Sequence, residues 1–180
     1  MSTPRGSPQV RLISSLAMLI VVIGGVWYYA VRRTGELFDI GANARVQCAM
    51  AEVNQGRAGR TEGLGDKFAP MLQPILDAAT GKLVYADRCT VAERAYVHIV
   101  LSWGRGGETT LISVILTQRG AQEEFPRLPG ALHTGTRNGY SVAAFESGGY
   151  LAYIVSALPG EPNRKLAARL KPIIDRFAKT

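Results

Sequence analysis

The chain has 180 residues, of which 47% are hydrophobic and 19% are charged, with 21 Lys and Arg against 14 Asp and Glu. This length allows one domain with an appendage, and the apolar fraction excludes wholesale disorder. Two cysteines and two histidines exclude a disulfide scaffold, a four-cysteine zinc site and a histidine-rich metal cage.

The first predicted element is residues 12–31, which contain no ionisable side chain other than tyrosine. As a helix, these twenty residues would span about 30 Å, the thickness of a hydrocarbon core. Basic residues flank the run, and aromatic residues gather at its end as at a membrane interface. A cleaved signal peptide is the competing interpretation, but Tyr28 is bulky for the −3 position of a cleavage site. We therefore predict a transmembrane helix anchored by Leu12, Trp27, Tyr28, Tyr29, Arg32 and Arg33.

This helix predicts the organisation of the whole chain. A short cytoplasmic tail at 1–11 would precede it, and a linker at 32–41 would connect it to an extracytoplasmic domain at 42–180. The charges that flank the apolar run only slightly favour a cytoplasmic N-terminus. The rest of the chain, residues 34–180, contains 17 basic and 14 acidic residues and therefore has a net charge of +3. We therefore expect contact with the lipid bilayer and no nucleic-acid partner, which would require a basic stripe.

Hydrophobic periodicity changes from helical to alternating along the domain. It predicts helices over about 42–55 and from Asp66 to Gly81, and a final amphipathic helix over 163–178 with Pro172 as a kink or restart. Strands are predicted at 83–89, 96–103, 109–118, 140–145 and 150–155, and the last four pair as two hairpins. Residues 119–138 are predicted to be a long loop. The predicted fold is α+β, with a five-stranded antiparallel sheet packed against about three helices.

The two cysteines, Cys48 and Cys89, permit three interpretations. Outside the cytoplasm the natural one is a disulfide between the first helix and the first strand. Two buried free thiols, or a redox or metal-binding pair supported by His98, are the alternatives. Because Val97, Ile99 and Leu101 alternate with His98, this histidine is expected on the opposite face of its strand. A single strand histidine without a neighbouring carboxylate is a weak candidate ligand, so no metal or cofactor is predicted.

Enzymatic activity has no support in the sequence. The G-x-S-x-G elbow of a serine hydrolase is absent. The Gly-rich stretch at 104–107 connects two antiparallel strands and lacks a following G-K-[ST], so it is a hairpin turn and not a phosphate loop. We predict that the protein is not an enzyme.

The segments VQCA (46–49), YADRC (85–89), AYVHIVLS (95–102), LISVILTQR (111–119) and YSVAAFESGGYLAYIVSALP (140–159) occur in an order and spacing that resemble one family. The family that these segments resemble is the extracytoplasmic half of single-pass bacterial anti-sigma-factor-like membrane proteins. The resemblance implies a bacterial inner-membrane anchor, a cytoplasmic N-terminus, an outer domain and paired cysteines. In such proteins a zinc-binding module before the membrane helix binds the sigma factor. The 11 residues before the helix here contain no Cys or His, so direct sigma-factor binding is not expected.

We therefore expect a non-enzymatic, membrane-anchored extracytoplasmic domain that binds or senses, or an accessory subunit of a larger membrane-protein complex. Its candidate partner-contact residues are Phe125, Leu128 and Leu132, although they are also suited to attach their loop to the core. The alternative function is a periplasmic thiol-redox or metal-handling domain that uses Cys48 and Cys89.

Overall fold

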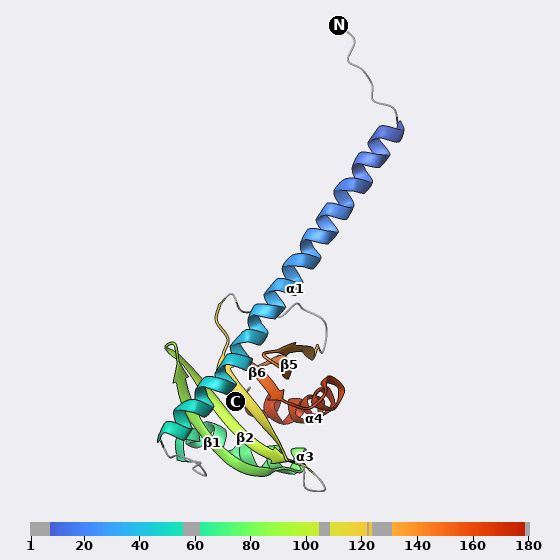
Figure 1. Cartoon of the computed structure of the whole chain (residues 1–180). Coiled ribbons are helices and arrows are strands. Elements are labelled where there is room, and N and C mark those ends of the chain that lie inside the picture. Colours follow the sequence, from blue (N-terminus) through green and yellow to red (C-terminus); the bar gives the residue numbers. More distant parts are fainter. Residues whose placement is uncertain (1–7, 56–61, 105–108, 122, 124–130, 179–180) are drawn as a thin grey trace. The chain divides into compact units, whose positions relative to one another are not determined.

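The computed structural model describes residues 8–55, 62–104, 109–121, 123 and 131–178, with side chains from Met18 onward except those of 51–55 and Glu62. The described chain forms two compact units that meet in sequence between Glu36 and Leu37. The first unit contributes a helical segment, and the second contains the sheet, both hydrophobic cores and every site discussed below. Figure 1 shows the elements in chain order.

Helices and short 3-10 turns come first and last, and the strands lie between them. The elements are α1 (Pro8–Gln55), η1 (Glu62–Leu64), α2 (Gly65–Phe68), η2 (Ala69–Met71), α3 (Leu72–Ala79), β1 (Lys82–Val91), β2 (Arg94–Trp103), β3 (Thr110–Gln118), β4 (His133–Arg137), β5 (Tyr140–Ser147), β6 (Tyr150–Ser156) and α4 (Gly160–Ala178).

The strands form one antiparallel sheet in the order β1-β2-β3-β6-β5-β4. The predicted antiparallel topology is confirmed, but the predicted number of five strands is wrong because the structure contains six. The additional strand is β4, which lies in the segment predicted as a long loop and pairs Arg137 with Tyr140. An Asn-Gly pair at 138–139 makes the hairpin turn, and this dipeptide is the strongest local hairpin signal.

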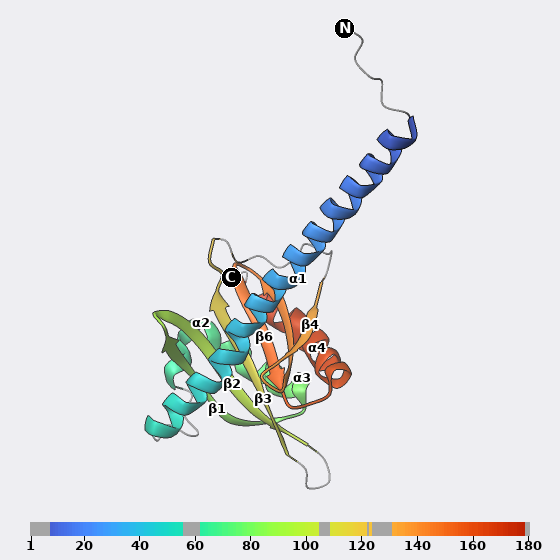
Figure 2. The ribbon, with the colours of Figure 1, turned by 45° about the horizontal axis from the view of Figure 1, so that its top comes forward.

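The two faces of the sheet carry separate hydrophobic cores. On one face, Val97, Ile99 and Leu101 of β2 join a cluster with residues of α2, α3 and α4. On the other face, the part of α1 that begins at Leu37 packs against residues that include Tyr153 and Val155. Figures 1 and 2 show the part of α1 from Leu37 onward crossing one face of the sheet while α3 and α4 lie behind it. The sheet is therefore the middle layer of the second unit.

The predicted transmembrane helix is wrong. Within the part of the chain that the structure describes, no helix is long and apolar enough to cross a membrane.

Other predicted boundaries also differ from the structure. The predicted linker at 32–41 is helical, because α1 continues through it to Gln55. The helix predicted from Asp66 is divided into α2, η2 and α3, with Pro70 in the first turn of η2. Helix α4 continues through Pro172, where we predicted a kink or restart.

Candidate functional site

A disulfide joins Cys48 of α1 to Cys89 of β1, with Cα atoms 5.8 Å apart. This pairing confirms the first of the three interpretations of the cysteines. Cys48 is completely buried between α1 and the sheet, and Cys89 packs against the same core. The bond therefore attaches the helix that covers one face of the sheet to an edge strand of that sheet.

His98 lies on the α1 side of β2, opposite Val97 and Ile99 as predicted. It is fully buried, and its Nδ1 atom lies 3.0 Å from the hydroxyl oxygen of Tyr85. Burial, followed by the positive charge of Arg45, lowers the pKa of His98 to about 3. This histidine is therefore neutral at ordinary pH.

Among the residues that the structure describes, His98 is not part of a group that could hold a metal ion. Cys48 and Cys89 are bonded to each other, so their sulfur atoms are not thiolate ligands. Among the described residues, no group of three or more His, Cys, Asp or Glu side chains is placed to hold a metal ion. The Nε2 atom of His98 has no hydrogen-bond partner in the described part of the chain.

Arg45 is the second polar group between α1 and the sheet. Its guanidinium donates to the carbonyl oxygen of Val155 at 2.6 Å and to that of Leu111 at 3.3 Å. It also lies over the ring of Tyr140, 4.4 Å from the centroid. Burial lowers the pKa of Arg45. These contacts position α1 across β3, β5 and β6, so the group has a structural role.

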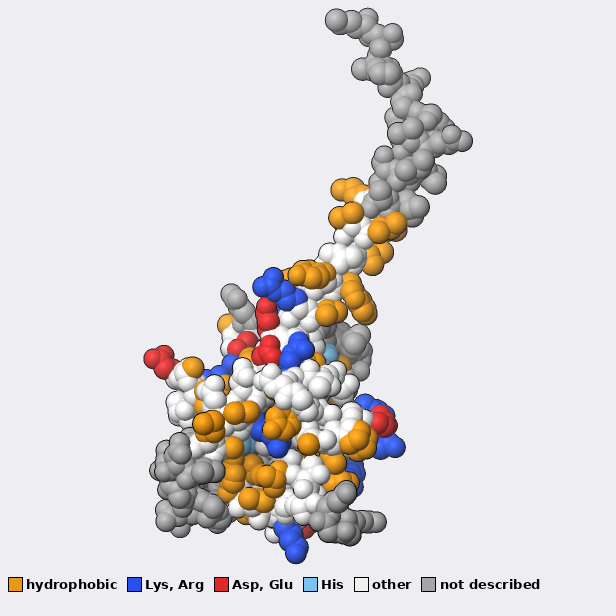
Figure 3. All heavy atoms as spheres, in the orientation of Figure 1, with side chains coloured by type: hydrophobic (Ala, Val, Ile, Leu, Met, Phe, Trp, Pro, Cys, Tyr) orange, Lys and Arg blue, Asp and Glu red, His pale blue; other side chains and the backbone are white. Residues whose placement is uncertain are grey.

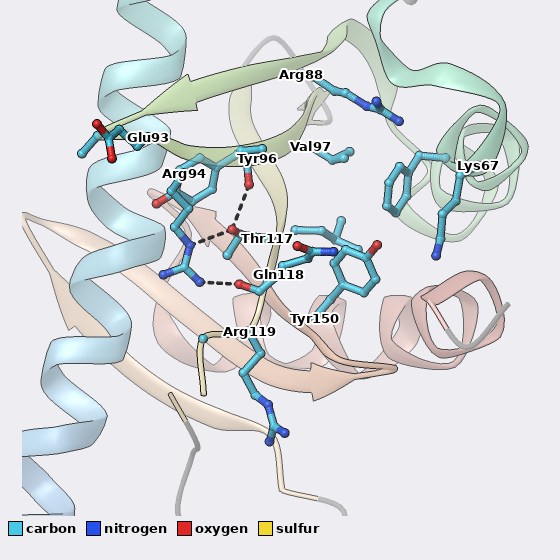
Figure 4. A pocket seen from close by; sticks show the side chains of 15 residues that line it. Lys67, Arg88, Glu93, Arg94, Tyr96, Val97, Thr117, Gln118, Arg119 and Tyr150 are labelled. Carbon is cyan, nitrogen blue, oxygen red and sulfur yellow. Dashed lines mark hydrogen bonds between the residues drawn. The ribbon is translucent and has the colours of Figure 1, made fainter. Parts of the chain in front are cut away.

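A cavity with several basic side chains in its lining lies at the end of the sheet where the β1–β2 hairpin meets the end of β3 and the start of β6. We call it the basic pocket (Figure 4). Its volume is about 710 Å³, within the range of small-molecule sites. The residues that line it are Lys67, Phe68, Arg88, Ala92, Glu93, Arg94, Ala95, Tyr96, Val97, Leu116, Thr117, Gln118, Arg119, Gly120 and Tyr150.

One wall of the basic pocket combines two aromatic rings with two cations. The rings of Phe68 and Tyr150 meet edge to face, with centroids 5.7 Å apart. The Nζ atom of Lys67 lies 5.2 Å from the Tyr150 centroid, and the guanidinium carbon of Arg88 lies 5.8 Å from that of Phe68. Figure 4 shows Lys67 beside Tyr150, with Arg88 on the same side of the pocket. Positive charge is therefore held against an apolar aromatic surface.

The other wall is organised by Arg94, at the start of β2. Its guanidinium forms a bidentate ion pair with Glu123, with distances of 2.6 and 2.7 Å. The same group donates to the hydroxyl of Thr117 and to the carbonyl oxygen of Gln118, each at 2.7 Å. The hydrogen bond from Arg94 holds the pKa of Glu123 below its usual value. Because the Arg94 guanidinium already donates to groups of the protein, it stabilises this wall and has few donors left for a bound anion.

Few of the described residues that line the basic pocket carry a nucleophilic group or a general base. Its lining contains no His, Cys or Ser. The Thr117 hydroxyl accepts from Arg94 and donates to the carbonyl oxygen of Ala95, so no base is positioned to activate it. The arrangement is suited to holding an anion.

No family model, curated protein or solved structure matches the chain. The resemblance to anti-sigma-factor-like membrane proteins stays a prediction.

The remaining predicted site residues do not converge on the basic pocket. Trp27, Tyr28 and Tyr29 are exposed on the first unit, and Figure 3 shows hydrophobic side chains along that helix. Arg33 donates to the hydroxyl of Tyr29 at 3.0 Å. Arg32 forms an exposed ion pair with Glu36.

Of the predicted partner-contact residues, only Leu132 lies among the described residues. It is partly buried and packs against the core on the α3–α4 face, which agrees with the attachment role that we weighed for it. Phe125 and Leu128 lie outside the described residues, as does the side chain of Leu12.

Sequence reasoning missed the basic pocket. Lys67 lies in α2, Arg88 in β1 and Arg119 directly after β3, so the three residues form no local motif. The local hints were weak, because Arg88 is one exposed residue within β1 and Arg119 is a single basic residue directly after β3.

Proposed function

We propose that the protein is a non-enzymatic, extracytoplasmic binding domain whose ligand occupies the basic pocket. One observation carries this proposal: Lys67 and Arg88 bring two positive charges to the aromatic wall of a ligand-sized cavity. Neither side chain forms an ion pair within the described part of the chain. Two cations beside aromatic rings, of which Tyr150 is only half-buried, are typical of a binding site.

The disulfide supports the proposed compartment. Structural disulfides form and persist in oxidising environments outside the cytoplasm and are rare inside it. The alternative role as a thiol-redox domain receives less support, because a reactive cysteine requires an accessible, activated sulfur and Cys48 is completely buried.

The test of binding is a thermal-shift screen of the full chain against small anionic, neutral and cationic compounds. We expect a group of anions to raise the midpoint of unfolding in a concentration-dependent manner, because a ligand that binds only the folded state stabilises it. Mass spectrometry of each hit after incubation should recover the compound unchanged. Absence of stabilisation by every compound, or conversion of the ligand, would contradict the proposal.

A role as an accessory subunit is the second form of the proposal. The apolar side chains that are exposed between Met18 and Val31 favour it, because contiguous exposed apolar surface commonly marks an interaction site. Native gel electrophoresis of the protein from its source is the test. Co-migration with a stoichiometric assembly that contains a membrane protein is expected for an accessory subunit, and migration alone would contradict that role.

A further inference from the structure

The ligand class of the basic pocket follows from how its charges are paired. We infer that the pocket takes a small organic anion in which a carboxylate is attached to a planar apolar body. This inference rests on the proposed function and names the ligand of the same site.

The pocket presents an excess of positive charge on one wall only. Arg94 is paired with Glu123 at 2.6 Å, and Arg119 is paired with Glu146 at 3.0 Å. Lys67 and Arg88 form no ion pair with a described carboxylate, and Glu93, the acidic residue in the lining, is exposed in the β1–β2 turn. A ligand with one negative group would thus bind at the Lys67–Arg88 wall, where it replaces water around two cations instead of competing with an existing ion pair.

The aromatic rings determine what the rest of the ligand must be. Phe68 is 5% exposed and belongs to the hydrophobic core, so its position is fixed, and Tyr150 packs against the same core. A carboxylate at these cations leaves the body of the ligand against the aromatic wall, where Tyr150 is the more accessible ring. Flat apolar groups bind such surfaces by burial and by edge or offset stacking. The two cations already lie within 6 Å of the ring centroids, so less side-chain freedom is lost on binding.

A nucleic-acid backbone fits the same observations less well. Affinity for nucleic acid depends on many phosphate contacts along a basic stripe. Here two cations have no ion-pair partner among the described residues, and the other two basic residues of the pocket, Arg94 and Arg119, have carboxylate partners. The pocket is a bounded cavity of about 710 Å³. A small molecule with a single acid group matches both the volume of this cavity and its two available cations.

The experiment compares 1-naphthylacetate with 1-naphthylacetamide, which share the ring system and differ in charge. Dissociation constants are measured by isothermal titration with the full-length chain. The test variant is K67Q/R88Q, which removes both charges and retains polar side chains. The control is K82Q/R176Q, which makes the same change of net charge at exposed positions outside the pocket. A further variant, Y150L, removes one ring, and urea unfolding verifies that each variant is folded.

We expect the acetate to bind about tenfold more tightly than the acetamide, because it forms two charge-assisted contacts. This preference should disappear in K67Q/R88Q and persist in K82Q/R176Q. Y150L should weaken both compounds by a similar factor, since both use the ring.

Three results would overturn the inference. Equal binding of the two compounds to the native chain, or a preference that survives K67Q/R88Q, would show that the unpaired cations do not select the ligand, while the proposed binding function stands. If neither compound binds, the ligand class is wrong, and the compound screen described above decides separately whether the domain binds any small molecule.

Discussion

Gly41 of α1 lies directly against the aromatic ring of Tyr153 in β6. A Cβ atom at position 41 would be 2.5 Å from both Cγ and Cδ1 of that ring. Tyr153 is fully buried at the centre of the α1-side core and cannot move aside without displacing its neighbours. The absence of a side chain at Gly41 therefore sets how closely α1 approaches the sheet.

G41A should destabilise the protein by about 1–3 kcal/mol, because overpacking outweighs the higher helix propensity of alanine. Urea unfolding measures the change. G24A is the matched control: Gly24 is also helical, but a Cβ there meets no atom within 4 Å. We expect no loss of stability in this variant. A G41A protein as stable as the native chain would contradict the close packing of α1.

Removal of the disulfide should cost about 2–4 kcal/mol, since the Cys48–Cys89 bond closes a loop with a sequence separation of 41. The comparison is urea unfolding of the native chain and of C48A/C89A, together with a thiol count in denaturant. The denatured native protein should show no free thiol until reductant is added. Detection of two free thiols would overturn the pairing.

His98 should make stability depend on pH. Burial and the charge of Arg45 lower its pKa to about 3 in the folded protein, against 6.5 for an ordinary histidine. Tyr85 and Asp87 face it from β1. Below pH 6.5 the unfolded chain binds a proton that the folded chain does not, so the free energy of unfolding should fall by up to about 1.4 kcal/mol per pH unit toward pH 3.

The measurement for His98 is urea unfolding from pH 7 to pH 5 in the native chain and in H98Q. The slope should be smaller in H98Q, whatever the absolute stability of that variant. H133Q is the comparison, because His133 is only half-buried, and it should retain most of the slope. Parallel pH profiles for the native chain and H98Q would contradict a buried neutral histidine.

The β1–β2 turn should be improved by glycine. Ala92 and Glu93 have φ values of 47° and 65°, a left-handed conformation that disfavours residues with a Cβ atom. A92N/E93G, which introduces the sequence used by the β4–β5 turn, should stabilise the protein by about 1 kcal/mol. Thermal unfolding measures this change. G149A, at φ 82° and with open space around it, should have the opposite effect.

Asn163 connects α4 to the sheet and should be sensitive to truncation. Its buried amide donates to the carbonyl oxygens of Ser141 and Ile154 at 3.2 and 3.1 Å, and its oxygen accepts from the hydroxyl of Ser156 at 2.8 Å. N163A removes the amide that these two carbonyl oxygens and the Ser156 hydroxyl bind, and it should lower the free energy of unfolding by about 2–3 kcal/mol. R169A, on the exposed side of the same helix, should change the urea midpoint little. Equal effects of the two variants would argue against this role.

The sequence alone determined the antiparallel sheet and the two faces of β2. Alternation of Val97, His98 and Ile99 is a local property of neighbouring residues, so it predicts which side chains share a face without knowledge of the fold. The same holds for the apolar stripe of α4, in which Leu166, Leu170 and Ile174 are buried as predicted. Both patterns follow the repeat of a single strand or helix, so the sequence of that element is enough to detect them.

The tertiary structure decided the rest, because it depends on contacts between distant residues. The pattern of a single helix does not indicate that Gly41 approaches Tyr153, or that α1 continues through the segment predicted as a linker. The basic pocket is the clearest case: Phe68 and Tyr150 are 82 positions apart, and only the sheet order β3-β6 and the placement of α2 bring their rings to 5.7 Å. The periodicity of one element predicts which of its faces is buried. Which residues that face contacts depends on how the distant elements of the chain pack together.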